Sequence, residues 1–295
     1  MKLTILRTLL FAVLLSLPVN TIAQGVLTFE DVMKFEDLTT PKISNQGNWL
    51  IYGVWPDRGD GQVVAQSVDG AQEFQIELGT NPIISSNERW VASRREVPLA
   101  VQLKEGKKAP KPGMSLLSLA DGSVTQFDSV SAFQFSNNGE WLVYKRLQSK
   151  VVEDLKSDHK NLGTELVLKE LESGSEFSFD FVTGFGFDSL THYLAYTVVD
   201  TSNAQNGIYL LELSTAKTVV IEQIESGLFA NLTWEPKKSN LAYTSATYDT
   251  SYTKSDATLK MWTSANKRLS TLVSPDEVDE EFALRSRNLL QFTND

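Results

Sequence analysis

The stretch Phe135-Ser136-Asn137-Asn138-Gly139-Glu140-Trp141-Leu142-Val143-Tyr144 decides the fold of this 295-residue chain. It begins with an aromatic residue that closes one strand and then reverses through a polar turn. It continues as a second strand of aromatic and aliphatic residues. Gly139 lies where such a turn favours a positive φ angle. The stretch therefore indicates a β-hairpin.

The same pattern occurs four more times along the chain. The other copies cover residues 43–52, 84–93, 187–196 and 234–243. The first residues of successive copies are 41, 51, 52 and 47 positions apart, and one four-stranded propeller blade has roughly 40–50 residues. Further strand-like stretches, such as residues 116–122, 166–174 and 208–213, lie between the copies and indicate a second hairpin in each period. We therefore predict an all-β protein, a β-propeller of about five four-stranded blades.

The end of the chain resembles the opening of a further copy. Phe292-Thr293-Asn294-Asp295 is comparable with Phe135-Ser136-Asn137-Asn138 and begins 58 positions after Trp234. The preceding residues are strand-like and would need a partner strand, which favours this interpretation over a frayed acidic tail. We expect propeller blades over residues 41–295, with a sixth blade that is only started and a domain that is truncated at its C-terminus.

The first residues have the order of an export signal. Lys2 and Arg7 supply positive charge, residues 9–17 form an apolar run, and Ala23 is a small residue at the expected cleavage site. The run is short for a membrane anchor. We expect a signal peptide over residues 1–23, cleavage after Ala23, and a periplasmic or secreted protein. Residues 24–40 should hold one short helix, capped by Thr28 with Asp31 three positions later.

Composition excludes several kinds of site. The chain has no cysteine, so it forms no disulfide and has no thiolate nucleophile or Cys-based metal site. Its only histidines are His159 and His192. The formal charge of −10 argues against nucleic acid as a main partner. We expect no cofactor and no metal.

Three groups of side chains invite a functional interpretation, and each has a simpler one. His159 lies in a mixed-charge run and His192 replaces a turn residue, so both are expected in exposed loops rather than as bases or metal ligands. Lys104, Lys107, Lys108 and Lys111 alternate with Gly and Pro, which predicts an extended mobile loop rather than a surface for an acidic partner. The odd-numbered phenylalanines Phe177, Phe179, Phe181, Phe185 and Phe187 should lie on one strand face in the core between neighbouring blades.

Four stretches are similar to the S9 family of serine peptidases, the prolyl oligopeptidase and acylaminoacyl-peptidase-like enzymes. They are residues 27–35, 41–49, 164–167 and 281–285. The resemblance implies an N-terminal propeller that covers the active site of a C-terminal α/β-hydrolase domain with a Ser, Asp and His triad. It also implies peptide substrates. This chain contains no G-x-S-x-G nucleophile elbow, so no triad residue can be assigned and we name no catalytic, cofactor-binding or metal-binding residue.

The acidic cluster near the C-terminus gains an interpretation from this resemblance. It consists of Asp276, Glu277, Asp279, Glu280 and Glu281. Some S9 relatives hold the free amino terminus of a substrate with a glutamate pair of the propeller, and Glu280-Glu281 is a formal candidate for this role. The spacing is unspecific, and we favour an exposed loop.

Three hypotheses for function follow. The first is the non-catalytic, substrate-gating propeller portion of an exported S9-type serine peptidase whose hydrolase domain lies outside these residues. The second is a periplasmic TolB-like propeller that acts as a binding or scaffold protein. The third, an enzyme that acts within the propeller, needs convergent carboxylates that spacing does not identify.

Overall fold

The structure is a computed structural model that describes residues 28–148, 162–249, 254–279 and 290–292. The chain divides into two compact units, residues 1–35 and 36–295. In the first unit, helix α2 (Phe29–Val32) begins after Thr28, whose hydroxyl accepts the N–H of Asp31 while the Asp31 carboxylate accepts the N–H of Thr28. This reciprocal cap confirms the predicted helix start. The predicted signal peptide lies outside the described residues and stays a prediction.

Blade 1 is a four-stranded antiparallel sheet that begins earlier than expected. Its strands are β1 (Glu36–Ile43), β2 (Trp49–Pro56), β3 (Gln62–Ser67) and β4 (Glu73–Glu77), in that order across the sheet. Glu36 already pairs with Pro56. The first blade therefore starts before residue 41, and the helical segment ends before residue 40, because the start of β1 completes the ladder along the end of β2.

Blade 2 carries a helical insertion that the sequence analysis did not predict. Its strands are β5 (Gly79–Ile84), β6 (Trp90–Arg95), β7 (Gly113–Ser118) and β8 (Val124–Phe127). Between β6 and β7 lie α3 (Leu99–Glu105) and a 3₁₀ turn, η1 (Gly106–Lys108). The expectation of an extended loop for Lys104, Lys107 and Lys108 is therefore wrong, because these residues continue a helix whose backbone hydrogen bonds begin at Pro98.

Blades 3 and 4 share one strand. A seven-stranded sheet contains β9 (Val130–Phe135), β10 (Trp141–Arg146), β11 (Thr164–Glu170), β12 (Glu176–Phe187), β13 (Tyr193–Val198), β14 (Gly207–Glu212) and β15 (Lys217–Gln223). The first half of β12 pairs with β11 as the outer strand of blade 3, and the second half pairs with β13 as the first strand of blade 4. Phe181, with φ 57°, lies where the strand passes between blades.

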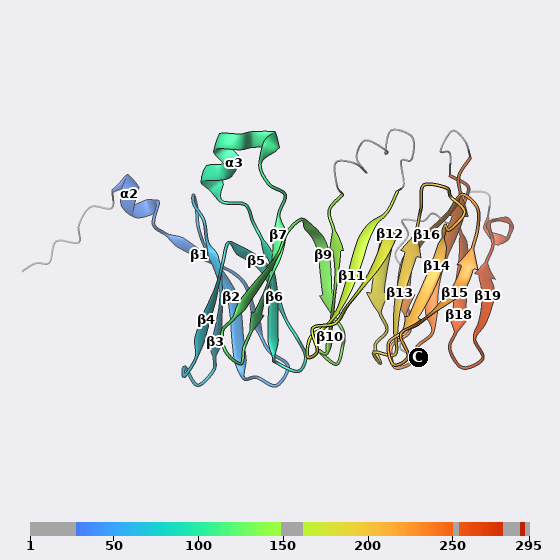
Figure 1. The fold of residues 1–295 in the computed structure, drawn as a ribbon, viewed down its shortest axis with the longest axis horizontal. Coiled ribbons are helices and arrows are strands. Elements are labelled where there is room, and N and C mark those ends of the chain that lie inside the picture. The colour runs from blue at the N-terminus through green and yellow to red at the C-terminus, as the bar shows by residue number, and fades with distance from the viewer. Residues whose placement is uncertain (1–27, 149–161, 250–253, 280–289, 293–295) are drawn as a thin grey trace, which may run out of the picture. The chain divides into compact units, whose positions relative to one another are not determined.

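Blade 5 completes the described propeller. Its strands are β16 (Gly227–Trp234), β17 (Leu241–Thr247), β18 (Thr258–Thr263) and β19 (Arg268–Val273), followed by the 3₁₀ turn η2 (Pro275–Glu277). The five predicted four-stranded blades are therefore confirmed, and Figure 1 shows them in chain order from blue to red. Leu290 to Phe292 have no regular secondary structure. The rest of the predicted sixth copy lies outside the described residues.

All five sequence copies form the same hairpin between the first two strands of a blade. In each copy the first residue pairs with the residue seven positions later. The pairs are Ile43 with Leu50, Ile84 with Val91, Phe135 with Leu142, Phe187 with Leu194 and Trp234 with Leu241. Gly47 and Gly139 have φ angles of 80° and 73°, as the turn pattern predicts. The repeat therefore fixes the register of every blade.

Apolar layers between consecutive blades form the core. Blades 1 and 2 meet around Ile51 and Leu117, and blades 2 and 3 meet around Met114 and Tyr144. Blades 3 and 4 meet around Val143, Leu166 and Leu194. Blades 4 and 5 meet around Leu210, Tyr243 and Trp262.

The phenylalanines of β12 contribute to the layer between blades 3 and 4. Phe187 is buried there, and Phe179, Phe181 and Phe185 pack against it. The predicted place of these four in the core between blades is therefore confirmed. Phe177 is the exception: it is 37% exposed and its ring centroid lies 6.4 Å from that of Trp141.

The five repeat turns are also tied to each other in series. We call their end of the blades the turn edge, defined by residues 44–48, 85–89, 136–140, 188–192 and 235–240. The Gln46 N–H and the Asn48 side-chain amide both donate to the Glu88 carboxylate at 2.7 Å. Asn87 donates to the carbonyl of Gly139 at 2.8 Å, and Asn137 donates to that of Ser189 at 2.9 Å. Each turn thus binds the turn of the next blade.

None of the helices in the described part of the chain has the length and apolar composition that a membrane span requires.

Candidate functional site

The end of the blades opposite the turn edge carries the longest connections. We call it the insertion edge, defined by the described residues of the connections from second to third strands: 57–61, 96–112, 147–148, 162–163, 199–206, 248–249 and 254–257. In Figure 1, α3 lies at this end of the strands and the repeat turns lie at the other. Binding residues gather disproportionately on such variable connections above a rigid scaffold. The insertion edge is therefore the first place to look for a site.

A polar pocket opens at the insertion edge of blade 3. Its volume is about 370 Å³. We call it the blade-3 pocket, and it is lined by Lys111, Ser131, Lys145, Arg146, Leu147, Gln148, Leu162, Gly163, Thr164, Val182 and Thr183. These residues come from the start of β9, the end of β10, the start of β11 and the middle of β12. The pocket thus lies where β12 leaves blade 3 for blade 4.

Backbone packing shapes the floor of the pocket. The N–H of Gly163 donates to the carbonyl of Val199 at 3.1 Å, which joins blade 3 to blade 4. A Cβ atom added at Gly163 would lie 1.9 Å from the carbonyl oxygen of Phe181. Only glycine permits this close approach of two backbone segments. The crossover of β12 therefore depends on this residue.

Two lysines extend into the blade-3 pocket and are held by backbone carbonyls. Lys145 Nζ donates to the carbonyl of Thr183 at 2.9 Å, so it links β10 of blade 3 to the crossover. Lys111 Nζ donates to the carbonyl of Gln148 at 2.9 Å, so it links the end of the α3 connection to the end of β10. The two lysines thus join separate segments of the pocket wall.

Arg146 forms the third cationic side chain of the wall. Its Nη1 donates to the carbonyl of Asp128 at 3.0 Å, and its Nε lies 3.0 Å from a carboxylate oxygen of Glu165. The guanidinium carbon lies 5.6 Å from the ring centroid of Tyr144, a cation–π contact. Burial and the Glu176 carboxylate outweigh the Arg146 charge and raise the pKa of Tyr144 to about 12. The tyrosine beneath Arg146 therefore stays neutral at physiological pH.

Thr164 supplies an unusual hydroxyl group. Its Oγ1 atom is buried and has no hydrogen-bond partner among the described residues. A buried hydroxyl without a partner costs free energy of about 1–3 kcal/mol, so such atoms are rare in native proteins. Thr164 lines the blade-3 pocket. Its hydroxyl oxygen is nonetheless buried, so it does not face the open part of the pocket.

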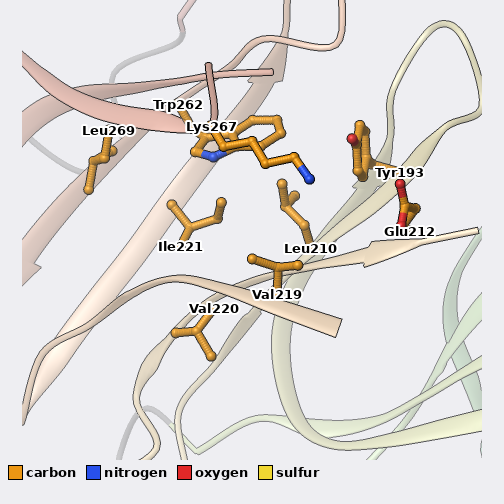
Figure 2. A pocket seen from close by; sticks show the side chains of 9 residues that line it. All are labelled: Tyr193, Leu210, Glu212, Val219, Val220, Ile221, Trp262, Lys267 and Leu269. Atoms are coloured by element: carbon orange, nitrogen blue, oxygen red, sulfur yellow. The ribbon is translucent and has the colours of Figure 1, made fainter. Parts of the chain in front are cut away.

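A second cavity lies at the opposite end of blades 4 and 5 and is mostly apolar. Figure 2 shows this slot, which has a volume of about 100 Å³ and is lined by Tyr193, Leu210, Glu212, Val219, Val220, Ile221, Trp262, Lys267 and Leu269. The Lys267 side chain extends along it toward Glu212 and Tyr193. Val219, Val220, Leu269 and Leu272 on the flanking strands β15 and β19 are between 37% and 49% exposed. Grouped exposed aliphatic side chains of this kind mark interaction surfaces.

The structure places His192 in an exposed turn, as predicted, and adds two neighbours. Its Nδ1 lies 3.3 Å from Oγ of Ser239, and that hydroxyl donates to the buried Asp188 carboxylate at 2.6 Å. In a serine-protease triad the histidine lies between the serine and the aspartate. Here the serine hydroxyl lies between the histidine and the aspartate and donates a hydrogen bond to the carboxylate. This trio ties blade 4 to blade 5 and is not arranged for nucleophilic attack.

The remaining candidates of the sequence analysis are distributed as follows. His159, Glu280 and Glu281 lie outside the described residues. The Glu277 carboxylate accepts the N–H of Ser274 at 2.8 Å and so caps η2. Of the four lysines around α3, only Lys111 lines a pocket described above. The expected absence of catalytic, cofactor-binding and metal-binding residues stays a prediction.

Sequence reasoning missed Lys145, Arg146 and Thr164. One signal was available in the repeat itself. Continuing the copies past their fourth strand residue gives Arg94-Arg95 in blade 2 and Lys145-Arg146 in blade 3, where the other blades have no basic residue. A pair of cations at the end of an otherwise apolar strand indicates that the strand ends at a polar surface.

Comparisons with known proteins describe the fold. No family model and no curated protein matches the chain. A solved structure of the β-propeller domain of the Trilobed protease from Pyrococcus furiosus is 15% identical, with a TM-score of 0.47 over 84% of this chain and 73% of that chain. Pyrococcus horikoshii acylaminoacyl peptidase is 12% identical, with a TM-score of 0.45 over 78% of this chain and 38% of that chain. TolB from Acinetobacter baumannii is 9% identical, with a TM-score of 0.38 over 80% of this chain and 54% of that chain.

These likenesses concern the fold alone. The chain spans 38% of the length of the acylaminoacyl peptidase and 54% of the length of TolB. Propellers of peptidases and of TolB are both among the similar structures, so the fold does not distinguish the peptidase hypothesis from the TolB-like hypothesis.

Proposed function

We propose that this chain is the non-catalytic propeller portion of an exported serine peptidase of the S9 type, in which it gates and helps bind short peptides. The observation that carries the proposal is the blade-3 pocket at the insertion edge, an opening of about 370 Å³ whose lining is mostly polar residues. The resemblance of residues 27–35 and 41–49 to the entry of S9 propellers supports it. In the parent protein, the serine nucleophile would belong to a hydrolase domain outside these residues.

Labelling with a fluorophosphonate probe tests the proposal. The gene is extended beyond Asp295, and both the 295-residue chain and the longer product are treated with the probe. We expect the longer product to be labelled at a single serine and the 295-residue chain to stay unlabelled. A stop codon directly after Asp295, or a longer product without a reactive serine, would refute the proposal.

Export is part of the same proposal. Lys2, Arg7 and the apolar run that ends before Pro18 support a cleaved signal peptide. N-terminal sequencing of the protein recovered from the periplasm or the medium should return Gln24 as its first residue. Recovery of the intact leader with the cytoplasmic fraction would argue against export.

The slot between blades 4 and 5 favours a second candidate function, a TolB-like binding or scaffold propeller. Its exposed aliphatic residues Val219, Val220 and Leu269 suit an apolar anchor residue of a protein partner. Under this hypothesis the tagged chain should recover a stable partner from periplasm, and Val220→Asp should abolish the recovery. Leu103→Asp, in the exposed helix α3, serves as the matched control and should leave it intact. Recovery that is unchanged by Val220→Asp would exclude the slot as the scaffold site.

A further inference from the structure

Each apolar layer of the propeller is built from two blade faces. We call the face that a blade turns toward the preceding blade its leading face, and the face that it turns toward the following blade its trailing face. In blade 3, Leu142 and Tyr144 lie on the leading face, in the same layer as Met114 of blade 2. Val143, between them in β10, lies on the trailing face, in the same layer as Leu194 of blade 4. The leading face of blade 1 and the trailing face of blade 5 are part of none of the four layers described above.

The leading face of blade 1 is apolar and exposed. Leu38 and Ile43 of β1 are 69% and 68% exposed. They lie opposite Val54 and Leu50 of β2, so these four side chains point to the same side of the sheet. The residues at the places of Leu38 and Ile43 in blades 3 and 4 are at most 8% exposed, because the preceding blade covers them: Val130, Phe135, Val182 and Phe187.

The second strand of blade 1 shows the same contrast. Leu50 and Tyr52 are half-buried. Their counterparts in blades 3, 4 and 5 are all buried: Leu142, Tyr144, Leu194, Tyr196, Leu241 and Tyr243. A repeat at the end of a stack needs a polar outer face if it is to stay in water. Blade 1 instead has the apolar leading face of an inner blade, defined by Leu38, Ile43, Leu50 and Tyr52.

Blade 5 has the matching trailing face. Leu259 and Met261 of β18 lie opposite Thr244 and Ala242 of β17 and are half-buried. Their counterparts in blades 3 and 4 are at most 1% exposed, because the following blade covers them: Leu166, Leu168, Ile208 and Leu210. The trailing face of blade 5, defined by Ala242, Leu259 and Met261, is therefore the other half of an inter-blade layer.

The outer strands of the two faces carry opposite charges. Glu73 of β4, Gln66 of β3 and Leu50 lie opposite one another, so Glu73 belongs to the leading side of blade 1. Arg268 of β19 lies opposite Thr263, on the side of the sheet that carries the apolar residues of the trailing face. Both charged residues are exposed, and both lie where the outer strand begins, next to the turn edge. Opposite charges at matching places favour one specific pairing of two surfaces.

We propose that the leading face of blade 1 binds the trailing face of blade 5 of a second copy of this chain. One molecule carries both halves of an inter-blade layer, so a second copy supplies to each face what a neighbouring blade supplies elsewhere in the propeller. This pairing brings Glu73 toward Arg268, whereas two copies of the same face would bring like charges together. Because different surfaces meet, the contact is heterologous, and such contacts form closed rings or open filaments. The proposal does not rest on the proposed peptidase function.

Sedimentation velocity of the full chain over a series of protein concentrations tests the proposal. We expect dimers and larger assemblies that increase with concentration. Ile43→Lys and Met261→Lys should each weaken the association by about tenfold or more, because each places an unpaired ammonium group in the layer. Leu103→Lys is the matched control, since it replaces an exposed apolar side chain of α3 in the same way, and it should assemble like the original chain. A chain that stays monomeric at every concentration would overturn the proposal and leave the two faces to a different partner.

A mixture of the two variants tests whether the faces pair head to tail. Ile43→Lys keeps an intact trailing face and Met261→Lys keeps an intact leading face, so their equimolar mixture should form dimers and nothing larger. Thermal unfolding of each variant checks that its Tm is unchanged. Monomers in the mixture of folded variants, or assembly of Ile43→Lys alone as strong as that of the original chain, would overturn the proposal. These outcomes are independent of the fluorophosphonate experiment, because self-association needs no reactive serine.

Discussion

The turn edge and the insertion edge of this propeller are built from the same strands and differ in almost every other respect. At the turn edge, five hairpins share one register, and the turn of each blade binds the turn of the next. At the insertion edge, the connections range from the short residues 57–61 of blade 1 to residues 96–112 of blade 2, which contain helix α3. The turns of the turn edge are thus alike and hydrogen-bonded to one another, whereas the connections of the insertion edge vary from blade to blade.

This difference between the edges predicts whether a substitution at each edge should change stability or ligand binding. Side chains of the turn edge form hydrogen bonds with neighbouring turns, so their loss should lower stability. Such bonds also join the insertion edge connections of blades 4 and 5, where Asn206 donates to the Gly227 carbonyl and Tyr248 donates to Asn203, but side chains that line the blade-3 pocket should affect ligand binding instead. The exception is the β12 crossover, which lies at the insertion edge and carries a packing constraint.

The largest loss of stability is expected for a substitution at the β12 crossover. Gly163→Ala would place a methyl group 1.9 Å from the Phe181 carbonyl oxygen, and overpacking of this kind costs about 3 kcal/mol. Gly186→Ala, within β12 itself, is the control, since its Cβ would meet only Trp234 Nε1 at 3.9 Å. Urea unfolding should show a large loss for Gly163→Ala and less than about 1 kcal/mol for Gly186→Ala. Equal losses would show that the crossover tolerates a side chain at residue 163.

A smaller loss is expected from the ties of the turn edge. Asp188 is buried and accepts the Tyr193 N–H at 2.8 Å and the Ser239 hydroxyl at 2.6 Å. Asp188→Ala leaves two donors without their acceptor and should cost about 2–3 kcal/mol. Ser136→Ala, in the turn of blade 3, removes a neutral acceptor of the Trp141 N–H and should cost about 1 kcal/mol. A larger loss of stability in urea unfolding for Ser136→Ala than for Asp188→Ala would contradict the hydrogen bonds assigned to Asp188.

Acid should loosen the tie between blades 1 and 2. Burial opposes ionisation of Glu88, but hydrogen bonds from Ser44, Asn48 and the Gln46 N–H outweigh it and hold its pKa below the ordinary value of 4.5. A lowered folded-state pKa gives stability that is present above the unfolded-state pKa and is lost as the pH falls through the folded-state value. Tm values measured between about pH 7 and about pH 3 should therefore fall less steeply for Glu88→Gln than for the original chain. Equal slopes of Tm against pH for Glu88→Gln and the original chain would refute this role of Glu88.

The smallest effect is expected on helix α3 at the insertion edge. Leu103 is 78% exposed, so Leu103→Ser should change the free energy of unfolding by less than about 0.5 kcal/mol. Chemical denaturation provides the measurement. A loss above about 1 kcal/mol would mean that α3 supports the blades and that the two edges do not differ as described.

The sequence was sufficient to predict the part of the fold that repeats. Five copies of a strand, a polar turn and a strand gave the blade number, and the structure adds that their registers agree. Helix α3 could not be found in this way, because its apolar residues Leu99, Val101 and Leu103 alternate with period two and Pro98 provides no side-chain cap. The start of β1 was missed for a related reason, since Glu36 and Asp37 precede the apolar alternation of a strand.

The blade-3 pocket was harder to predict than the fold. Its lining comes from four strands and from the α3 connection, and only the crossover of β12 brings these segments together. The buried Thr164 hydroxyl group is unusual because it has no hydrogen-bond partner among the described residues, and no sequence pattern indicates this. The Lys145-Arg146 pair was visible, but its chemistry depends on the carbonyls and carboxylate that surround it.

Amide hydrogen exchange of the 295-residue chain tests the division between the two edges most directly. Our account predicts slow exchange at the Trp141 and Tyr193 amides, which donate to turn-edge side chains, and faster exchange in helix α3 at the insertion edge. Faster exchange at those two amides than in α3 would contradict it.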